Sequence, residues 1–256
     1  MVKNILLLIA AMACGAVSTS AQTTIEDSIM VDGAYRSYRL YIPPGNTLSE
    51  RPLVLNMHGL GSNAFEQQYY SNFMPIADTA GFYIVMPQGT EYSGSTFWNV
   101  GFPGTPAVND VKFLSALIDT ISAHYPVDAG RVYATGMSNG GYMAHLLGIE
   151  LNSKIAAIAS VTGTIVPQKY AAAAPGRVVP AMQVHGTADM TVPYGGFNYG
   201  IPIDSVVSFW VRNNNCSMTP VRTAVPNSNT GDGSTAERFV WSGGRNGATR
   251  ATTGDD

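Results

Sequence analysis

One serine, Ser138, stands in a pattern typical of an activated nucleophile. Gly136 and Gly140 flank it in the spacing Gly-x-Ser-x-Gly, after the β-rich run 132–135 and before a helix-like stretch that starts at Tyr142. A sharp strand-to-helix turn brings backbone atoms too close together for larger residues, so the glycines suit such a turn. The segment is therefore predicted to be a nucleophile elbow.

The residue after the serine, Asn139, is predicted to contribute its backbone N–H to an oxyanion hole, because the N-terminus of a helix stabilises negative charge. An alternative is that Ser138 only caps the helix in a glycine-rich turn. A phosphate-binding loop is disfavoured, since no Gly-Lys-Ser/Thr sequence follows. The strand before the motif and the helix after it favour the elbow.

A second candidate oxyanion donor follows the predicted strand 52–57, which runs into a glycine-rich turn at 58–63. Turns in this place often carry the second amide of an oxyanion hole. We assign that amide to Leu60. His58 is predicted to hold the turn through hydrogen bonds, and its place beside the site makes it a candidate substrate-binding residue.

Asp189 is the candidate acid. It follows the predicted strand 178–184, so it is expected at the same carboxyl edge of the sheet as Ser138, where the active sites of open α/β sheets lie. The alternative is that Asp189 only caps the turn that leads to Tyr194. Tyr194 is predicted to contact substrate.

A long loop is predicted over residues 89–108, and it suits a wall of a substrate cleft. We expect Trp98 to bind substrate there, with a packed surface loop as the alternative. The aromatic residues of the loop are Tyr92, Phe97, Trp98 and Phe102.

No histidine stands where a general base is expected. Hydrolases of this kind place serine, acid and histidine in that chain order, but the four histidines, His58, His124, His145 and His185, all precede Asp189. His145 is about 10 Å along the helix from Ser138, and His124 is expected at the opposite edge of the sheet. The Cα atoms of His185 and Asp189 would lie about 13 Å apart if the strand continued. None is predicted to act as the base.

The segment 248–256 lacks the apolar alternation of a core strand, although a partner for the predicted strand 237–241 is expected after Gly247. The hypothesis that follows is a chain truncated or frame-shifted near Ala248, without its last strand and catalytic histidine. Activity would then be severely reduced and a sheet edge left uncovered.

Strands and helices alternate along the rest of the chain, which predicts an α/β fold in one domain with a mostly parallel sheet and helices on both faces. Two strands are expected within 25–42, and further strands at 82–86 and 155–161. Helices are expected at 65–79, 109–125, 142–150 and 203–213, and a polar loop at 219–235.

The N-terminal residues 1–21 carry a lysine, an apolar run and then small residues, which is the pattern of a secretory signal cleaved after Ala21. The apolar run is shorter than the roughly 20 residues that span a membrane. A weaker alternative is a lipoprotein signal that leaves Cys14 lipidated. After ordinary cleavage only Cys216 remains, which excludes an intramolecular disulfide within this chain.

Charge excludes one class of partner. The chain has 14 basic and 17 acidic residues and a net charge of −3, without a basic cluster. It therefore lacks the electrostatic footprint of a nucleic-acid-binding protein.

The elbow at 136–141, the turn at His58-Gly59 and the segment 185–189 together resemble the secreted esterases of the polyhydroxybutyrate depolymerase and feruloyl esterase family, which is related to carbohydrate esterase family 1. The resemblance runs from about Ser37 to Gly247. It implies an α/β-hydrolase fold, no metal or cofactor, and hydrolysis of feruloyl or acetyl esters on plant xylan or of hydroxyalkanoate polyesters.

The same resemblance implies roles for single residues. Ser138 is the nucleophile, Asp189 orients a histidine, and Leu60 and Asn139 form the oxyanion hole. The histidine of the family follows the last strand, and this sequence has none there. A serine peptidase of the same fold and a non-catalytic polysaccharide- or polyester-binding protein remain as alternatives.

Overall fold

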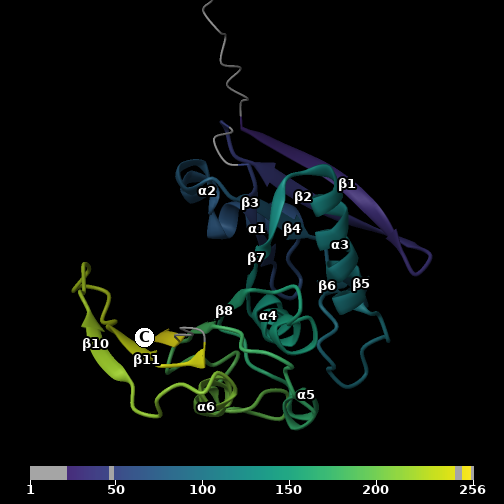
Figure 1. The fold of residues 1–256 in the computed structure, drawn as a ribbon. Coiled ribbons are helices and arrows are strands. Elements are labelled where there is room, and N and C mark those ends of the chain that lie inside the picture. Colours follow the sequence, from purple (N-terminus) through teal and green to yellow (C-terminus); the bar gives the residue numbers. More distant parts are fainter. Residues whose placement is uncertain (1–21, 46–48, 246–249, 255–256) are drawn as a thin grey trace, which may run out of the picture.

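The apolar strands form the middle of one large sheet. The computed structural model describes residues 22–45, 49–245 and 250–254, and within these residues ten strands make up this sheet (Figure 1). They are β1 (Thr23–Val31), β2 (Ala34–Ile42), β3 (Arg51–Met57), β4 (Tyr83–Pro87), β7 (Val127–Met137), β8 (Ala157–Val161), β9 (Ala181–Val184), β10 (Val221–Val225), β11 (Ala236–Trp241) and β12 (Arg250–Gly254). Across the sheet they run in the order β1-β2-β4-β3-β7-β8-β9-β12-β11-β10. The predicted signal sequence 1–21, including Cys14, lies outside the described residues.

The central strands are parallel. β3 pairs with β4 and β7, β7 with β8, and β8 with β9. All five residues of β4 are buried, as expected of a strand that is covered on both faces. Antiparallel strands join at the two ends, β1 and β2 at one and β10 and β11 at the other. The predicted α/β fold with a mostly parallel sheet is confirmed.

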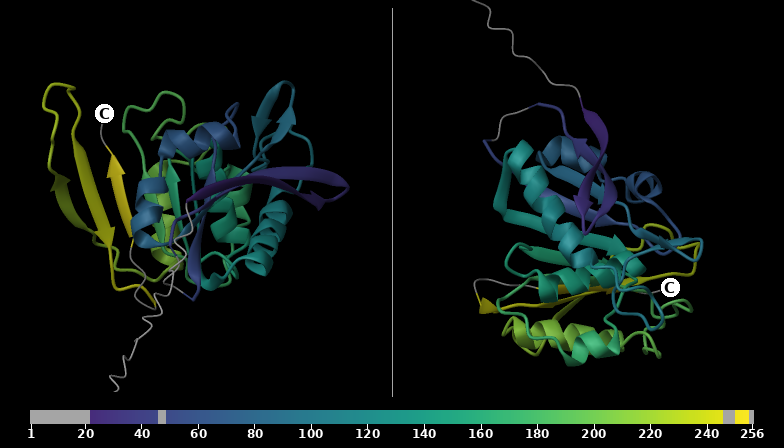
Figure 2. Two further views of the ribbon diagram at one scale, coloured as in Figure 1. Left: turned by 90° about the horizontal axis from the view of Figure 1, so that it is seen from above. Right: turned by 90° about the vertical axis from the view of Figure 1, so that its right-hand side faces the viewer.

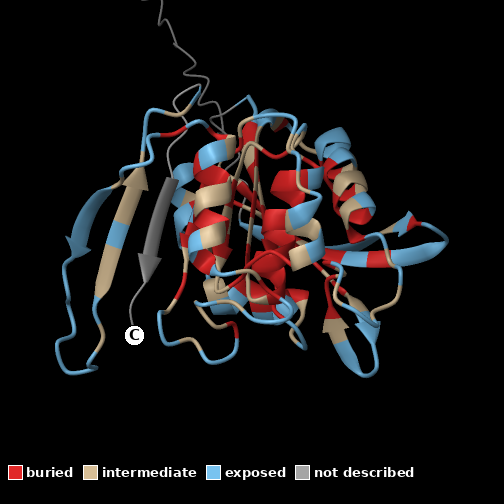
Figure 3. Cartoon of the chain, turned by 90° about the horizontal axis from the view of Figure 1, so that it is seen from below, coloured by how far each residue is buried: buried red, intermediate tan, exposed pale blue. Residues whose placement is uncertain are grey.

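Helices cover both faces of the sheet (Figure 2). α1 (Ala64–Ser71) and α2 (Met74–Ala80) connect β3 to β4, and α3 (Asp110–His124), α4 (Asn139–Glu150), α5 (Pro167–Ala171) and α6 (Ile203–Asn213) follow later strands. Because such connections are right-handed and the strand order reverses direction after β4, α1 and α2 lie on one face and the other helices on the opposite face. Buried residues gather in the strands and on the helix sides turned toward them (Figure 3).

Helices α1 and α3 start at the carboxyl edge of the sheet, and each is capped by an asparagine. The side chain of Asn63 accepts a hydrogen bond from the Glu66 amide at 2.9 Å, and that of Asn109 accepts one from the Lys112 amide at 2.9 Å. Such caps satisfy backbone donors that the helix leaves unpaired. The prediction of one helix over 65–79 is wrong, because Asn72 takes a left-handed conformation between α1 and α2.

Two predicted loops contain strands. The segment 89–108 holds a hairpin of β5 (Thr90–Tyr92) and β6 (Ser95–Phe97), whose turn residues Ser93 and Gly94 both have positive φ. Positive φ at both central residues gives the turn the twist that a two-residue hairpin needs. The predicted polar loop 219–235 contains β10.

The expectation that the C-terminal segment forms no strand is wrong. β12 lies between β9 and β11, parallel to the first and antiparallel to the second, so β11 has a neighbour on each side. Apolar alternation reports burial of one face, whereas strand pairing depends on backbone hydrogen bonds, and threonine suits strands. The predicted uncovered edge at β11 therefore does not occur.

Two further observations concern the described part of the chain. None of its helices has the length and apolar character needed to cross a membrane. Cys216 is buried.

Candidate active site

The turn between β7 and α4 places Ser138 at the carboxyl edge of the sheet. Ser138 has φ 53° and ψ −120°, a conformation that residues other than glycine rarely adopt. A Cβ atom on Gly136 would lie 2.6 Å from backbone atoms of Gly140 and Met57, and one on Gly140 would be closer still to Met57. The two glycines let strand, turn and helix pack this closely, which is the geometry of a nucleophile elbow.

The side chain of Asn139 ties the elbow to the segment around Trp98. Its amide oxygen accepts a hydrogen bond from the Trp98 backbone N–H at 2.6 Å, and its amide nitrogen donates to the Trp98 carbonyl at 3.0 Å. The backbone N–H of Asn139, the first residue of α4, has no acceptor within the helix. That amide therefore remains suited to the oxyanion role predicted for it.

The turn after β3 packs directly against the elbow. A Cβ on Gly59 would lie 3.6 Å from the Cβ of Ser138, and the next residue, Leu60, borders the same pocket as Ser138 and Asn139. The structure thus brings together the predicted nucleophile and both residues predicted to form the oxyanion hole.

His58 holds this turn from below and does not border the pocket. It is fully buried, its Nδ1 lies 2.7 Å from the Gly59 carbonyl, and its Nε2 accepts the Gly89 amide at 2.9 Å. An Nε2 that accepts leaves the ring proton on Nδ1, which donates to Gly59. Burial lowers the pKa of His58, in keeping with a neutral ring. The predicted turn-holding hydrogen bonds are present, and the predicted contact with substrate is not.

Trp98 is also a structural residue, which corrects the expectation that it contacts substrate. Its side chain is fully buried, and its Nε1 donates to the His58 carbonyl at 2.9 Å. The position in an apparent loop suggested exposure, but the hydrogen bonds to Asn139 and His58 draw Trp98 beneath the site.

A pocket of about 300 Å³ opens beside Ser138. Its walls are mostly aromatic: Phe102 meets Tyr142 edge-on at 5.3 Å between ring centroids and Tyr199 at 6.3 Å, and Phe197 meets Tyr199 at 5.9 Å. Of these rings, sequence reasoning had placed only Phe102 in a substrate cleft. The complete lining is Leu60, Phe102, Pro103, Ser138, Asn139, Tyr142, Val192, Phe197 and Tyr199.

Asp189 lies in the loop after β9, and one carboxylate oxygen caps that loop. Its Oδ1 accepts the amides of Thr191 at 2.8 Å and Val192 at 2.9 Å. Burial, followed by the negative charge of Asp189, raises the pKa of Tyr142. The capping role that was the alternative is thus present. Oδ2 takes no part in this cap, and the role of triad acid stays a prediction.

The straight strand from which a separation of His185 and Asp189 was expected does not occur, because β9 ends at Val184, before both residues. The His185 Nε2 lies 3.7 Å from the Asp189 Oδ2. The ring is nevertheless buried, because its Nε2 donates to the Val192 carbonyl at 2.7 Å and its Nδ1 lies 3.1 Å from the Gln183 amide nitrogen. His185 therefore supports the acid loop.

The other two histidines lie away from the nucleophile. His145 is buried on α4 between Gln183 at 2.9 Å and the Trp210 indole at 3.1 Å. His124 ends α3 and contacts the Thr120 carbonyl. Within the described residues, none of the four histidines hydrogen-bonds to Ser138.

Tyr194, predicted to contact substrate, lies in a different pocket. Its hydroxyl donates to the Asp204 Oδ1 at 2.9 Å, and its neighbours there include Val207 and Trp241. The loop after Asp189 carries Tyr194 away from Ser138 and brings Phe197 and Tyr199 toward it. Among the described residues, no cluster of three or more histidine, cysteine or acidic side chains is arranged to hold a metal ion.

A comparison of the sequence with known protein families shows the family to which this chain belongs. Residues 36–194, which include the elbow, the turn after β3 and Asp189, match the family described as esterase PHB depolymerase. The chain belongs to this family. The esterase PHB depolymerase family was the one that the sequence motifs resembled, so that prediction is confirmed.

Relatives and solved structures agree with this membership. The bifunctional acetylxylan esterase/xylanase of Neocallimastix patriciarum is 33% identical over 67% of this chain, and the matched region covers 24% of that protein. Feruloyl esterase B of Talaromyces stipitatus is 29% identical over 81% of this chain and 67% of its own length. The structure of an acetyl xylan esterase from Aspergillus awamori superposes with a TM-score of 0.67 at 16% identity, covering 90% of this chain and 92% of that one. The fold is that of the α/β-hydrolases.

Proposed function

We propose that this chain is a secreted serine esterase that cleaves carboxylic esters through an acyl-enzyme. The observation that carries the proposal is the strained elbow that holds Ser138 at the wall of an aromatic pocket, next to Leu60 and Asn139. Membership in the esterase PHB depolymerase family supports the same reaction class.

The reaction begins when the Ser138 Oγ attacks the ester carbonyl carbon and gives its proton to a base. The carbonyl oxygen becomes an oxyanion, which the backbone amides of Asn139 and Leu60 stabilise. The C–O bond to the alcohol then breaks, the alcohol leaves with a proton, and the acyl group stays on Ser138. Water attacks this acyl-enzyme in the same way and releases the acid.

Three substrate classes fit the proposal: acetyl or feruloyl esters of plant xylan, and polyhydroxyalkanoate polyesters. The names of the relatives support the first two, and the name of the family supports the third. The aromatic lining of the pocket suits an acyl group with apolar surface, since aromatic side chains bind such groups by burial and edge contacts.

The base for Ser138 is not one of the four histidines of this chain. His58, His145 and His185 are buried in hydrogen bonds of their own, and His124 lies at the end of α3. We therefore expect residues 22–256 alone to turn over esters slowly and to be accelerated by added imidazole, which can take the proton in place of a histidine side chain.

Export by the N-terminal segment is part of the proposal. The pattern of residues 1–21 supports cleavage after Ala21. Mass determination of the mature protein checks this step: an N-terminus at Gln22 supports a secreted protein, and a lipidated Cys14 supports the anchored alternative.

The test is to compare hydrolysis of para-nitrophenyl acetate and methyl ferulate with that of peptide anilides, for the wild type and Ser138→Ala, with and without imidazole. Ester hydrolysis that depends on Ser138 supports the proposal. Cleavage of the anilides alone would indicate a serine peptidase. Binding of xylan or polyester without any turnover, even with imidazole, would indicate a non-catalytic binding protein.

A further inference from the structure

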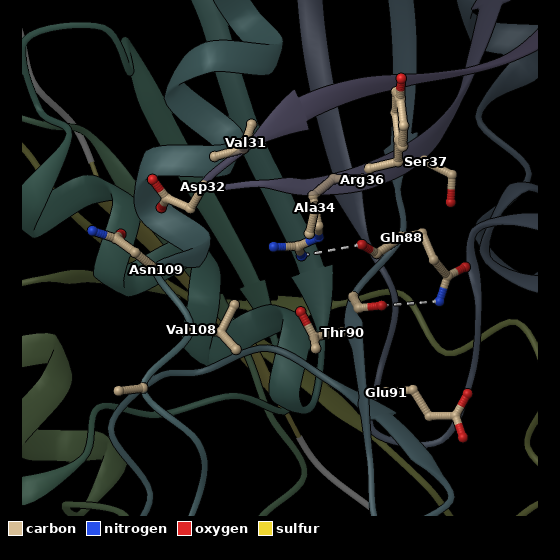
Figure 4. A pocket seen from close by; sticks show the side chains of 13 residues that line it. Val31, Asp32, Ala34, Arg36, Ser37, Gln88, Thr90, Glu91, Val108 and Asn109 are labelled. Carbon is tan, nitrogen blue, oxygen red and sulfur yellow. Dashed lines mark hydrogen bonds between the residues drawn. The ribbon is translucent and has the colours of Figure 1, made fainter.

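A second pocket lies at the same edge of the sheet as Ser138, over different strands. It has a volume of about 490 Å³ and lies between the turn that joins β1 to β2, the segment after β4 and the start of α3 (Figure 4). It shares no lining residue with the pocket beside Ser138. The chemistry of its walls therefore needs its own explanation.

The floor of this pocket carries a fixed guanidinium group. Arg36 is only 9% exposed, and its Nη2 donates to the Asp110 Oδ1 at 2.6 Å and to the Gln88 carbonyl at 3.3 Å. The guanidinium also lies over the Phe113 ring, 4.1 Å from its centroid. These contacts hold Arg36 rigidly, so its remaining N–H groups form a preorganised donor array.

The charge balance does not favour an anion. Asp110 neutralises Arg36 at short range, and the two carboxylates on the walls are Asp32 and Glu91. Asp32 forms an ion pair with Lys112. The three carboxylates named here thus outnumber the two basic groups, Arg36 and Lys112, by one. An anionic ligand would meet this surplus negative charge, and an apolar ligand would leave the buried polar groups without partners.

The polar groups suit a neutral polyol. The carboxylates accept hydrogen bonds, Arg36 donates them, and the buried Thr90 Oγ1 has no hydrogen-bond partner among the described residues. Tyr35, on the rim, is 75% exposed. A sugar ring offers matching features, because its hydroxyls both donate and accept while its C–H face can lie against an aromatic ring.

The pocket lies near Ser138 at the same edge of the sheet. β4 is separated from β7 by β3 alone, so the ends of β4 and β7 are about 10 Å apart. The β5–β6 hairpin links the two sites: Thr90 and Glu91 on β5 line the pocket, while the Thr96 carbonyl on β6 accepts the Gly61 amide at 2.8 Å. A polymer bound with its ester at Ser138 can thus reach the second pocket.

We propose that this pocket binds a sugar ring of the polysaccharide chain whose ester group is held at Ser138. The inference rests on the proposed function, since it takes a polysaccharide ester as the substrate. It assigns the polymer backbone to a site of its own, apart from the aromatic pocket that receives the acyl group.

The test is isothermal titration calorimetry with xylotetraose, which carries no ester. The wild type should bind it, and Tyr35→Ala and Glu91→Gln should each weaken binding about tenfold, the effect of one lost aromatic or charged contact. Tyr70→Ala and Glu50→Gln are matched controls, because Tyr70 is 71% exposed and neither residue lines the pocket. The controls should bind xylotetraose as the wild type does.

Two outcomes overturn the inference: the wild type does not bind xylotetraose, or the pocket variants and the controls bind equally. Failure of the proposed function would look different. If para-nitrophenyl acetate is cleaved but xylotetraose does not bind, only the sugar site fails. If xylotetraose binds in the pocket while no ester is cleaved with or without imidazole, the sugar site stands and the esterase proposal fails.

Discussion

The predicted nucleophile, Ser138, and the predicted acid, Asp189, are held in different ways. Around Ser138, backbone geometry leaves almost no freedom: Gly136 and Gly140 meet neighbouring backbone so closely that a methyl group does not fit. Around Asp189, side chains hold the loop in place. The Asp189 carboxylate accepts hydrogen bonds from amides of the loop, and His185 donates one to the Val192 carbonyl. The elbow is thus fixed by backbone packing against the turn after β3, which lies far away in the sequence, and the acid loop by hydrogen bonds between residues close to one another in the sequence.

This difference has a consequence for mutation. A change in the elbow must displace strand β7, helix α4 or the turn after β3, all of which belong to the core of the sheet. A change in the acid loop can be absorbed by the loop itself. We therefore expect the elbow to be the less tolerant region.

The largest effect is expected for Gly140→Ala. The added methyl group would collide with the Met57 and His58 carbonyls, so the free energy of unfolding should fall by at least about 3 kcal/mol. Urea denaturation measures this change. Gly195→Ala is the control, because a Cβ there meets nothing within 4 Å, and it should change stability by less than about 0.5 kcal/mol. Equal effects of the two substitutions would break the contrast between the regions.

A smaller effect is expected for His58→Gln, which disturbs the hydrogen bonds to Gly59 and Gly89. Losing such bonds in a buried place costs about 2 kcal/mol at neutral pH.

The same residue gives a pH dependence. Burial lowers the pKa of His58, so the unfolded chain takes up this proton at higher pH than the folded chain does. The stability that neutral His58 contributes is full above about pH 6.5 and is lost as the pH falls through the folded pKa. Denaturation between neutral and acid pH should show a shallower decline for His58→Gln than for the wild type. His124→Gln, at the end of α3, should keep the wild-type slope. A wild-type slope in His58→Gln as well would refute the inference that His58 is neutral in the folded protein.

The smallest effects concern the loop after Asp189. Tyr199→Ala removes part of the aromatic wall beside Ser138, and KM for an apolar ester should rise about fivefold in the presence of imidazole. Tyr194→Phe removes the hydrogen bond to Asp204, in a different pocket, and should leave KM within about twofold. Steady-state kinetics of both variants, with unchanged kcat, separates the two positions. A larger rise in KM for Tyr194→Phe than for Tyr199→Ala would mean that Tyr194, and not Tyr199, lies beside Ser138.

Some features of the site can be predicted from the sequence, and others cannot. The elbow, the oxyanion turn and the parallel sheet follow from local patterns, namely glycine spacing, buried strands and helix caps. Side chains such as Trp98 were misplaced, because their burial depends on partners about forty residues away. Phe197 and Tyr199 gave no signal beyond an aromatic, glycine-rich loop, and their place in the pocket depends on how that loop returns to Ile165 and Gly200.

Strand β12 and the approach of His185 to Asp189 were missed for a related reason. Alternation of apolar residues predicts which face of a strand is buried, whereas β12 is held by pairing with β9 and β11. The distance from His185 to Asp189 was computed along a straight strand, and the chain instead turns at the end of β9. Both features depend on the direction of the backbone, which composition does not reveal.

If the elbow makes Ser138 a nucleophile, the serine should react covalently with an electrophilic probe. The protein is incubated with a fluorophosphonate, with imidazole present, and digested for peptide mass spectrometry, with Ser138→Ala in parallel. The account predicts one phosphonyl adduct, on the peptide that contains Ser138, and none in the variant. A wild-type protein that stays unlabelled, or that is labelled at another residue to the same extent in both proteins, would contradict it.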